Sequence, residues 1–246
     1  MKINSTVFLT ANWKYLIFCN YTVEPEILMP YLPAGTQLDF FNSKAYVSLV
    51  GFYFTDTRLK GVSIPFHRHF EEFNLRFYVK WKNGNEWKRG VVFIKEIVPK
   101  PLITYVASWL YGEHYYYHPM KHTIKQEDDS ILVQYQWKVG NEWNNMQVEA
   151  KESLGKMAKP DSEAFFITEH YYGFTKQPNL STSFYQVEHP SWRIFPVSNY
   201  QIHCNVAELY GSSFIPFLQE PQSVFLAEGS SVKVYQKKLL QLQNNQ

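Results

Sequence analysis

Residues 71–79 alternate between apolar and polar side chains in the way that is typical of a β-strand. Successive side chains of a strand lie on opposite faces. The apolar face, which we expect to be buried, consists of Phe73, Leu75, Phe77 and Val79. The other face carries an acid, an amide, a guanidinium and a phenol, namely Glu72, Asn74, Arg76 and Tyr78. This polar face either contacts water or, if the sheet curls, lines a cavity in which a Glu and an Arg could hold a small polar ligand.

Similar strand-like patterns occur along much of the chain, and they predict a β-rich protein. The other clear segments are 44–54, 89–97, 131–138 and 145–150, and the strand that contains 71–79 is expected to cover 70–81. Two turns between strands share a Gly-Asn core, in residues 81–87 and 137–143. They predict two similar β-hairpins, and a duplication, chance or convergent turn chemistry would explain the similarity.

Helices are expected at only a few places. Residues 24–29 have a proline near the first helical position and acidic residues in the first turn. A second helix is expected after Pro101, with apolar residues spaced along one face and Gly112 as its stop. A third is expected within 206–219. No linker rich in Pro, Gly or Ser divides the chain, so we expect residues 1–246 to form a single domain of the α+β class, mostly β.

Composition narrows the possible functions. Aromatic residues make up 18% of the chain, and the net charge is only +2, without clusters of Lys or Arg between the aromatics. Nucleic-acid binding is therefore not expected. No apolar run approaches the roughly 18 residues of a membrane span, and Cys19 and Cys204 are too few for a disulfide framework. We expect a cytoplasmic protein without a membrane partner.

Motifs for metals, cofactors and nucleophiles are weak. The tract 113–122 contains three histidines and His67-x-His69 adds two, but neither has an acid or cysteine at a ligand spacing, so no metal is expected. Glycine-rich phosphate loops and a Gly-x-Ser-x-Gly elbow are absent from the sequence, so we expect no cofactor and can name no nucleophile. His170 and His189 each stand beside aromatic residues, which more often indicates a structural role than a catalytic one.

Several short motifs resemble, in order, those of the YqjF-like uncharacterised family (domain of unknown function 2071), within the acetoacetate decarboxylase-like superfamily. The most specific are Glu72-x-Asn74-x-Arg76 and His189-x-x-Trp192. The weaker ones are Pro25-x-x-Leu28, Leu32-Pro33-x-Gly35, Asp39, Ala45 to Val50, Gly90-Val91-x-Phe93, Tyr115 to Met120 and Phe166-x-Thr168-Glu169-x-Tyr171. The resemblance covers about Trp13 to Val234. It implies a strongly curved, largely antiparallel sheet, closed or nearly closed around a central cavity with few flanking helices, and it favours an inward-facing Glu72, Asn74 and Arg76.

The resemblance also implies a change of chemistry. Acetoacetate decarboxylases use a lysine that forms a Schiff base, activated by a neighbouring lysine. Tyr115 and Tyr116 occupy the matching positions here, and tyrosine cannot form an imine. Lys121, the nearest alternative, lacks a paired lysine. Decarboxylation through a Schiff base is therefore not expected.

Two functional classes remain open. The first is a small-molecule-binding protein with a polar and aromatic internal cavity for a small carboxylate or oxo-acid-like ligand, and the residues expected to bind it are Glu72, Asn74, Arg76, Tyr78, Tyr115 and Trp192. The alternative is a lyase, hydratase or isomerase acting on a small oxo-acid-like substrate without a Schiff-base lysine. Its candidate catalytic residues are Glu72, Arg76, Tyr115 and His189. Either class is compatible with a homo-oligomer.

Overall fold

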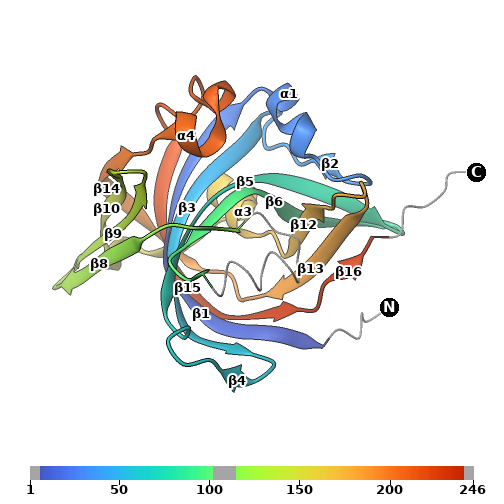
Figure 1. Cartoon of the computed structure of the whole chain (residues 1–246). Helices are drawn as coiled ribbons and strands as arrows, with labels where there is room; N and C mark the ends of the chain where they lie inside the picture. Colours follow the sequence, from blue (N-terminus) through green and yellow to red (C-terminus); the bar gives the residue numbers. More distant parts are fainter. Residues whose placement is uncertain (1–5, 102–114, 241–246) are drawn as a thin grey trace, which may run out of the picture.

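The computed structural model describes residues 6–101 and 115–240, and its main feature is a ring of seven strands (Figure 1). In their order around the ring these are β13 (Thr182–Glu188), β12 (Tyr172–Lys176), β6 (Glu86–Val98), β5 (Phe70–Asn83), β3 (Ala45–Leu59), β1 (Val7–Val23) and β15 (Ser223–Tyr235), which pairs again with β13. Among the strand pairs of this ring, only the β12–β6 contact is parallel, and it joins two residue pairs. The predicted α+β, mostly β class and the curved, largely antiparallel, nearly closed sheet are confirmed.

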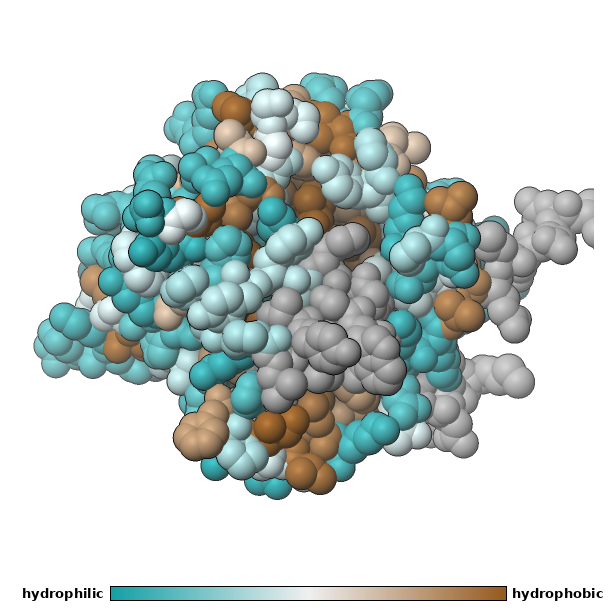
Figure 2. Space-filling view, in the orientation of Figure 1, coloured by the Kyte–Doolittle hydropathy of each residue, from teal (hydrophilic) through white to brown (hydrophobic). Residues whose placement is uncertain are grey.

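A second layer of strands continues from β15 and folds against the outside of the ring. Its strands are β14 (Arg193–His203), β10 (Glu142–Lys151), β9 (Ser130–Val139) and β8 (Met120–Glu127). The Trp137 indole stacks on Phe73 of β5 with 3.7 Å between ring centroids, and the Tyr135 hydroxyl donates to the Tyr15 carbonyl at 2.9 Å. Figure 2 shows mostly hydrophilic side chains over the outer edge of this layer, around β8.

Strand β5 separates the inside of the ring from the second layer. Its predicted apolar face, Phe73, Leu75, Phe77 and Val79, is completely buried in the core between the ring and the second layer. The opposite face, which carries Glu72, Asn74 and Arg76, is turned to the inside of the ring. One strand therefore supplies both a hydrophobic interface and a row of polar groups, as the alternation predicts.

Both predicted Gly-Asn hairpins are present. Gly84 joins β5 to β6 and Gly140 joins β9 to β10, with φ angles of 61° and 56°. Positive φ values are what a tight hairpin turn requires and what glycine adopts without strain.

Short elements complete the structure. The short strands are β2 (Gln37–Leu38), β4 (Val62–Ser63), β7 (Tyr115–Tyr117), β11 (Lys156–Met157) and β16 (Lys238–Leu239). The α-helices are α1 (Pro25–Leu28), α3 (Glu163–Thr168) and α4 (Val206–Tyr210), and the 3₁₀ turns are η1 (Met29–Tyr31), η2 (Glu152–Leu154) and η3 (Ser212–Phe214). None of the helices in 6–101 and 115–240 is long and apolar enough to cross a membrane.

The helix predictions have three outcomes. The helix at 24–29 is confirmed as α1, with Pro25 at its start. The prediction of one helix within 206–219 is wrong in length, because Gly211 adopts a φ of 89° and separates α4 from η3. The helix expected after Pro101 lies outside the described residues.

Candidate functional site

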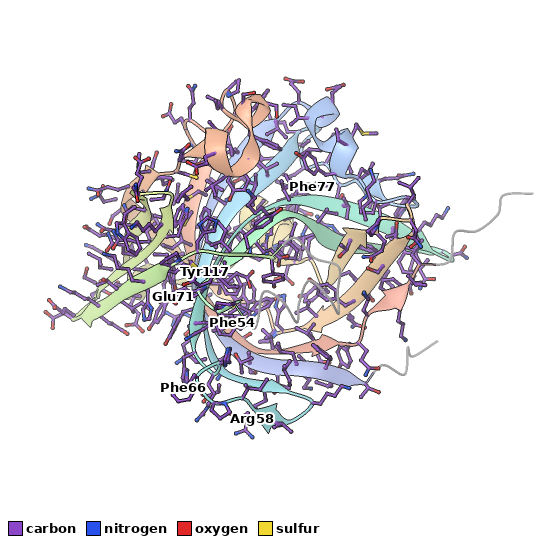
Figure 3. The ribbon with its side chains drawn as sticks, viewed as in Figure 1. Phe54, Arg58, Phe66, Glu71, Phe77 and Tyr117 are labelled. Carbon is purple, nitrogen blue, oxygen red and sulfur yellow. The ribbon has the colours of Figure 1, made fainter. Side chains whose placement is uncertain are left out.

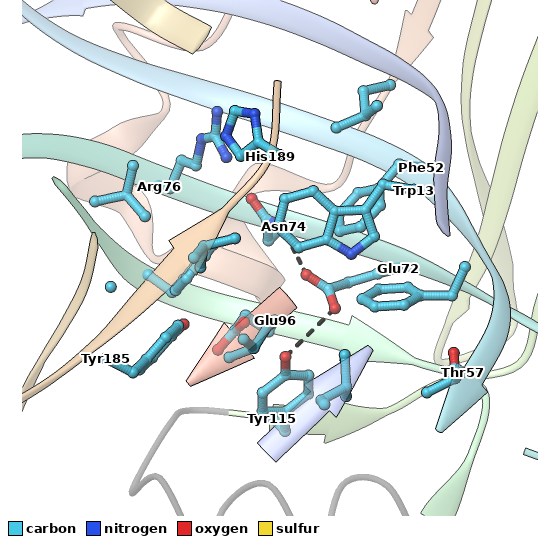
Figure 4. Close-up of a pocket in the computed structure, with 18 of the residues that line it drawn as sticks. Trp13, Phe52, Thr57, Glu72, Asn74, Arg76, Glu96, Tyr115, Tyr185 and His189 are labelled. Atoms are coloured by element: carbon cyan, nitrogen blue, oxygen red, sulfur yellow. Dashed lines mark hydrogen bonds between the residues drawn. The ribbon is translucent and has the colours of Figure 1, made fainter. Parts of the chain in front are cut away.

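The ring encloses a cavity of about 170 Å³, and most of the side chains around it are apolar or aromatic. Its polar lining comes from several strands and one helix end (Figure 4). The polar residues of its lining include Glu72, Asn74, Arg76, Glu96, Tyr115, Thr168, His170 and His189. All of them line the same cavity, although they come from several separate segments of the chain.

Glu72 is the centre of one cluster. Its carboxylate accepts hydrogen bonds from Asn74 Nδ2 at 3.0 Å and from the Tyr115 hydroxyl at 3.3 Å (Figure 4). Glu96 pairs with Asn74 across β5–β6 and with Tyr115 across β6–β7. Two buried carboxyl groups, an amide and a phenol therefore meet on one wall, where they can accept or donate hydrogen bonds to a bound molecule.

Arg76 lies further along the same face of β5. Its guanidinium carbon is 5.0 Å from the centroid of the Phe18 ring, and Nη2 donates to the Ile167 carbonyl at 3.5 Å. Within 6–101 and 115–240, no carboxylate lies within 4.0 Å of the guanidinium, and Nε has no hydrogen-bond partner. Asn74 and Tyr115, and not Arg76, therefore contact the Glu72 carboxylate.

His170 is a buried histidine on the cavity wall, just after α3. Its Nε2 lies 3.4 Å from Asp39 Oδ2, which also accepts a hydrogen bond from Arg89 Nε at 2.6 Å. Burial lowers the pKa of His170 to about 4 despite the opposing effect of Asp39, so the ring is neutral at pH 7. Burial would raise the pKa of Asp39, but His170 and Arg89 bring it below its ordinary value.

His189 and Trp192 form another part of the wall. Their rings stack with 4.2 Å between centroids, and the Trp13 indole packs against both. Trp192 Nε1 donates to Ser230 Oγ at 2.9 Å, while His189 Nδ1 lies 2.9 Å from the Pro190 carbonyl. Burial lowers the pKa of His189 as well. These contacts hold the two side chains in the cavity wall.

Five of the six residues expected to bind a ligand line the cavity, and Tyr78 does not. The Tyr78 hydroxyl lies 2.6 Å from Ser48 Oγ, in a buried chain of hydrogen bonds that continues to Asn20. The Tyr78 ring packs behind the cavity wall against His170, with 4.8 Å between the ring centroids. The alternation placed Tyr78 on the correct face, but this position lies beyond the end of the cavity.

The two tyrosines at the positions of the paired lysines, Tyr115 and Tyr116, lie in different environments. Tyr115 lines the cavity, whereas Tyr116 is 44% exposed and lies under the Lys95 ammonium group. Lys121 is on β8, with its ammonium 4.4 Å from the Trp143 ring centroid. No lysine of the described ranges lines the cavity, and the sequence of 102–114 contains none.

The two described histidines of the tract 113–122, His118 and His122, have separate partners. His118 Nδ1 contacts the Lys138 carbonyl, and His122 Nδ1 lies 2.6 Å from the Glu71 carboxylate. His67 Nδ1 contacts the Pro65 carbonyl. Within the described part of the chain, no group of three or more His, Cys, Asp or Glu side chains is arranged to hold a metal ion.

The sequence alone did not identify Glu96 or the Asp39–His170 contact as parts of the site. Asp39 and Thr168 belong to the quoted family motifs, and His170 was noticed beside aromatic residues, but no local signal joins these positions. Strand pairing around the ring is what brings Asp39, next to the β2 edge, to the residues that follow α3.

The comparisons with known proteins agree with this architecture. The YqjF protein of Bacillus subtilis (strain 168), described as uncharacterized, is 27% identical over 187 residues, which cover 75% of this chain and 74% of that protein. An acetoacetate decarboxylase-like enzyme from Sphingomonas wittichii RW1 superposes with a TM-score of 0.65 at 11% identity, over 95% of this chain and 93% of that one. The enduracididine biosynthesis enzyme MppR complexed with pyruvate superposes with a TM-score of 0.63 at 11% identity, over 98% and 92%.

At these identities the two solved structures show the fold alone. The model of a family described as an uncharacterized conserved protein, domain of unknown function 2071, matches residues 10–231. The chain therefore belongs to this uncharacterized family and has the acetoacetate decarboxylase-like fold.

Proposed function

We propose that the chain binds a small carboxylate or oxo-acid-like ligand in the cavity, with Arg76 as the group that holds the carboxylate. The observation that carries the proposal is the state of the Arg76 guanidinium. It lies on the cavity wall, stacks on Phe18, and has no carboxylate within 4.0 Å in the described ranges. A partly buried guanidinium without an anionic partner is suited to bind one from outside, and Arg binds carboxylates through two parallel hydrogen bonds.

The remaining lining supports the same assignment. Apolar and aromatic walls with a few polar groups at one end are typical of small-molecule sites. A structural neighbour, MppR, was solved with pyruvate, which is a small oxo acid. Glu72 and Tyr115 would then contact the part of the ligand that lies away from its carboxylate.

Binding measurements on paired arginine variants test the proposal. We expect pyruvate or phenylacetate to bind the native protein, as measured by calorimetry or ligand-observed NMR. Arg76→Lys keeps the charge but loses the planar two-point contact, so the affinity should fall by about 10-fold to 100-fold, which corresponds to the loss of a charge-assisted hydrogen bond.

Arg58→Lys is the matched control, because Arg58 is on β3, is exposed, and is not part of the cavity lining (Figure 3). Its affinity for the same acids should equal that of the native protein. If Arg76→Lys, with an unchanged circular dichroism spectrum, binds both acids as tightly as the native protein does, Arg76 is not the carboxylate anchor.

A second candidate is an enzyme of the lyase, hydratase or isomerase type. The contact between Glu72 and the Tyr115 hydroxyl at 3.3 Å favours it, because a carboxylate and a phenol in one cavity can act as base and acid. The test is the exchange of the methyl protons of pyruvate in D₂O, followed by NMR. Exchange that is faster than in buffer and is lost in Glu72→Gln would indicate proton abstraction, whereas binding without exchange would indicate recognition alone.

A further inference from the structure

Several buried polar atoms on residues that line the cavity, among them Trp13 Nε1 and Thr57 Oγ1, have no hydrogen-bond partner in the described part of the chain, and three others belong to the polar face of β5 and to His170. These three are Asn74 Oδ1, Arg76 Nε and His170 Nδ1. Buried polar groups are nearly always hydrogen-bonded, because an unsatisfied group loses its interactions with water without replacement. Together the three atoms form a pattern of donors and acceptors that a bound molecule can complete.

The roles of two of these atoms follow from chemistry. An arginine nitrogen can only donate, so Arg76 Nε requires an acceptor. Asn74 Nδ2 faces the Glu72 carboxylate at 3.0 Å, an assignment that follows from hydrogen bonding because a carboxylate accepts. Asn74 Oδ1 is therefore on the other side of the amide, and it requires a donor.

His170 adds a second acceptor. Its Nε2 faces Asp39 Oδ2 at 3.4 Å, a contact that is too poorly aligned to count as a hydrogen bond. A lone pair directed at a carboxylate would be repelled, so we assign the proton of the neutral ring to Nε2. Nδ1 is then an acceptor, and like Asn74 Oδ1 it requires a donor.

These groups are close enough to contact one small molecule. The Arg76 guanidinium carbon and the His170 ring both lie against the Tyr78 ring, 5.7 Å and 4.8 Å from its centroid. Arg76 also reaches the carbonyl of Ile167, which precedes His170 by less than one helical turn. Arg76 and His170 are therefore neighbours in the lining of the cavity, on either side of their shared contact with Tyr78.

Most of the remaining lining is apolar or aromatic, although it also contains Thr57 and His67. Phe52, Phe54 and Phe70 line it toward the β3–β4 end, and Phe70 precedes Arg76 by about 20 Å of strand. The volume of about 170 Å³ is similar to that of an engineered apolar cavity of about 150 Å³ that holds benzene. The cavity as a whole therefore suits a molecule that contains no more than about one ring.

We propose that the ligand is a 2-hydroxy carboxylic acid with an apolar substituent no larger than about one ring. This inference rests on the proposed function. The carboxylate binds Arg76, and the hydroxyl group donates to His170 Nδ1, with Asn74 Oδ1 as the second acceptor. A 2-oxo acid would direct an oxygen lone pair at these acceptors, and the ammonium group of an amino acid would lie near the cations of Arg76 and Arg89.

The experiment compares acids that differ only at the second carbon: mandelate in both enantiomers, phenylglyoxylate, phenylacetate and phenylglycine. One enantiomer of mandelate should bind the native protein about 3-fold to 10-fold more tightly than phenylacetate, the difference expected for one hydrogen bond. Phenylglyoxylate and phenylglycine should bind no more tightly than phenylacetate.

Two substitutions of His170 separate recognition from folding. His170→Asn carries an amide oxygen near the position of Nδ1 and should retain the preference for mandelate. His170→Gln presents its amide near the position of Nε2, so mandelate and phenylacetate should bind it equally. Nitrogen-15 NMR of the native protein is independent of any variant, and it should show an unprotonated Nδ1 whose signal shifts when mandelate binds.

The outcomes distinguish this inference from the proposed function. If all four acids bind equally and all depend on Arg76, the carboxylate site stands and the hydroxyl preference is overturned. A preference for phenylglyoxylate or phenylglycine, or a protonated Nδ1 in the native protein, also overturns it. If none of the acids binds, the proposed function fails and this inference fails with it.

Discussion

His170 should make the stability of this protein depend on pH between about 7 and 5. Its ordinary pKa is about 6.5, and burial lowers the pKa to about 4 in the folded protein. The unfolded chain therefore binds a proton that the folded chain excludes. The stabilisation is complete above the unfolded pKa and is lost as the pH falls from about 6.5 toward about 4.

The expected size follows from the two pKa values. Because one pKa unit corresponds to about 1.4 kcal/mol, the free energy of unfolding should fall by about 2 kcal/mol between pH 7 and pH 5, and by about 3 kcal/mol once the pH is below both values. Asp39 stays ionised in this window, because its pKa is lower than usual.

Urea denaturation at several pH values between 7 and 5 measures this loss, with His170→Asn as the comparison. The asparagine is polar but does not titrate, so its free energy of unfolding should fall by about 2 kcal/mol less than that of the native protein over the same range. His189, whose pKa burial also lowers, titrates in both proteins and cancels. Parallel curves for the two proteins would show that His170 is protonated as easily in the folded state as in the unfolded chain, and would refute the reasoning.

Three further predictions concern the packing of Trp192, the space beside Gly90 and the absence of a lysine from the described lining of the cavity. Trp192→Ala should lower the free energy of unfolding by about 3–5 kcal/mol in urea denaturation, because its indole is buried and donates to Ser230, and a loss below about 1 kcal/mol would contradict this packing. Gly90→Ala should destabilise by about 1–3 kcal/mol or more, because the new Cβ would lie 2.4 Å from the Tyr172 carbonyl oxygen at the β12–β6 contact; a stability equal to the native value would show that this contact yields easily. Borohydride treatment with pyruvate or acetoacetate should produce no adduct by mass spectrometry, since no lysine of the described ranges lines the cavity, and a stoichiometric adduct on one lysine would contradict this.

The parts of the fold that sequence patterns could predict are those encoded by neighbours in the chain. The alternation in β5 predicted which of its side chains are buried between the layers, since strand geometry alone decides this. The two Gly-Asn hairpins and the start of α1 at Pro25 depend on local backbone preferences in the same way. The division of 206–219 into α4 and η3 was missed because the pattern of apolar residues continues past Gly211. The helix ends there because the Gly211 backbone adopts a positive φ angle.

The site was less predictable because its polar groups meet through long-range pairing. Asp39 and His170 are far apart in the sequence, and each has an ordinary local setting. Their contact arises because β2 joins the edge of β5 and because α3 directs the following residues toward the same end of the ring. Tyr78 shows the converse limit, since alternation predicts the face of a strand but not where along that face a cavity ends.

A single irregularity in β6 decides which charged side chain enters the cavity. Arg76 pairs with Phe93 and Leu75 pairs with Lys95, so Ile94 is an extra residue that forms a β-bulge. Without it, the alternation that turns Val91 and Phe93 inward would turn Lys95 inward as well.

With the bulge, Glu96 lines the cavity, and the Lys95 ammonium lies outside it, 4.6 Å from the Tyr116 ring centroid and 6.0 Å from that of Tyr210. Burial lowers the pKa of Lys95, which is the property that an imine-forming lysine needs, yet this amine is on the wrong side of the sheet. The backbone register thus gives the cavity a second carboxyl group in place of an amine. Acid–base chemistry or hydrogen-bonded recognition is therefore available to this family member, whereas covalent capture of a carbonyl by Lys95 would require β6 to change its register.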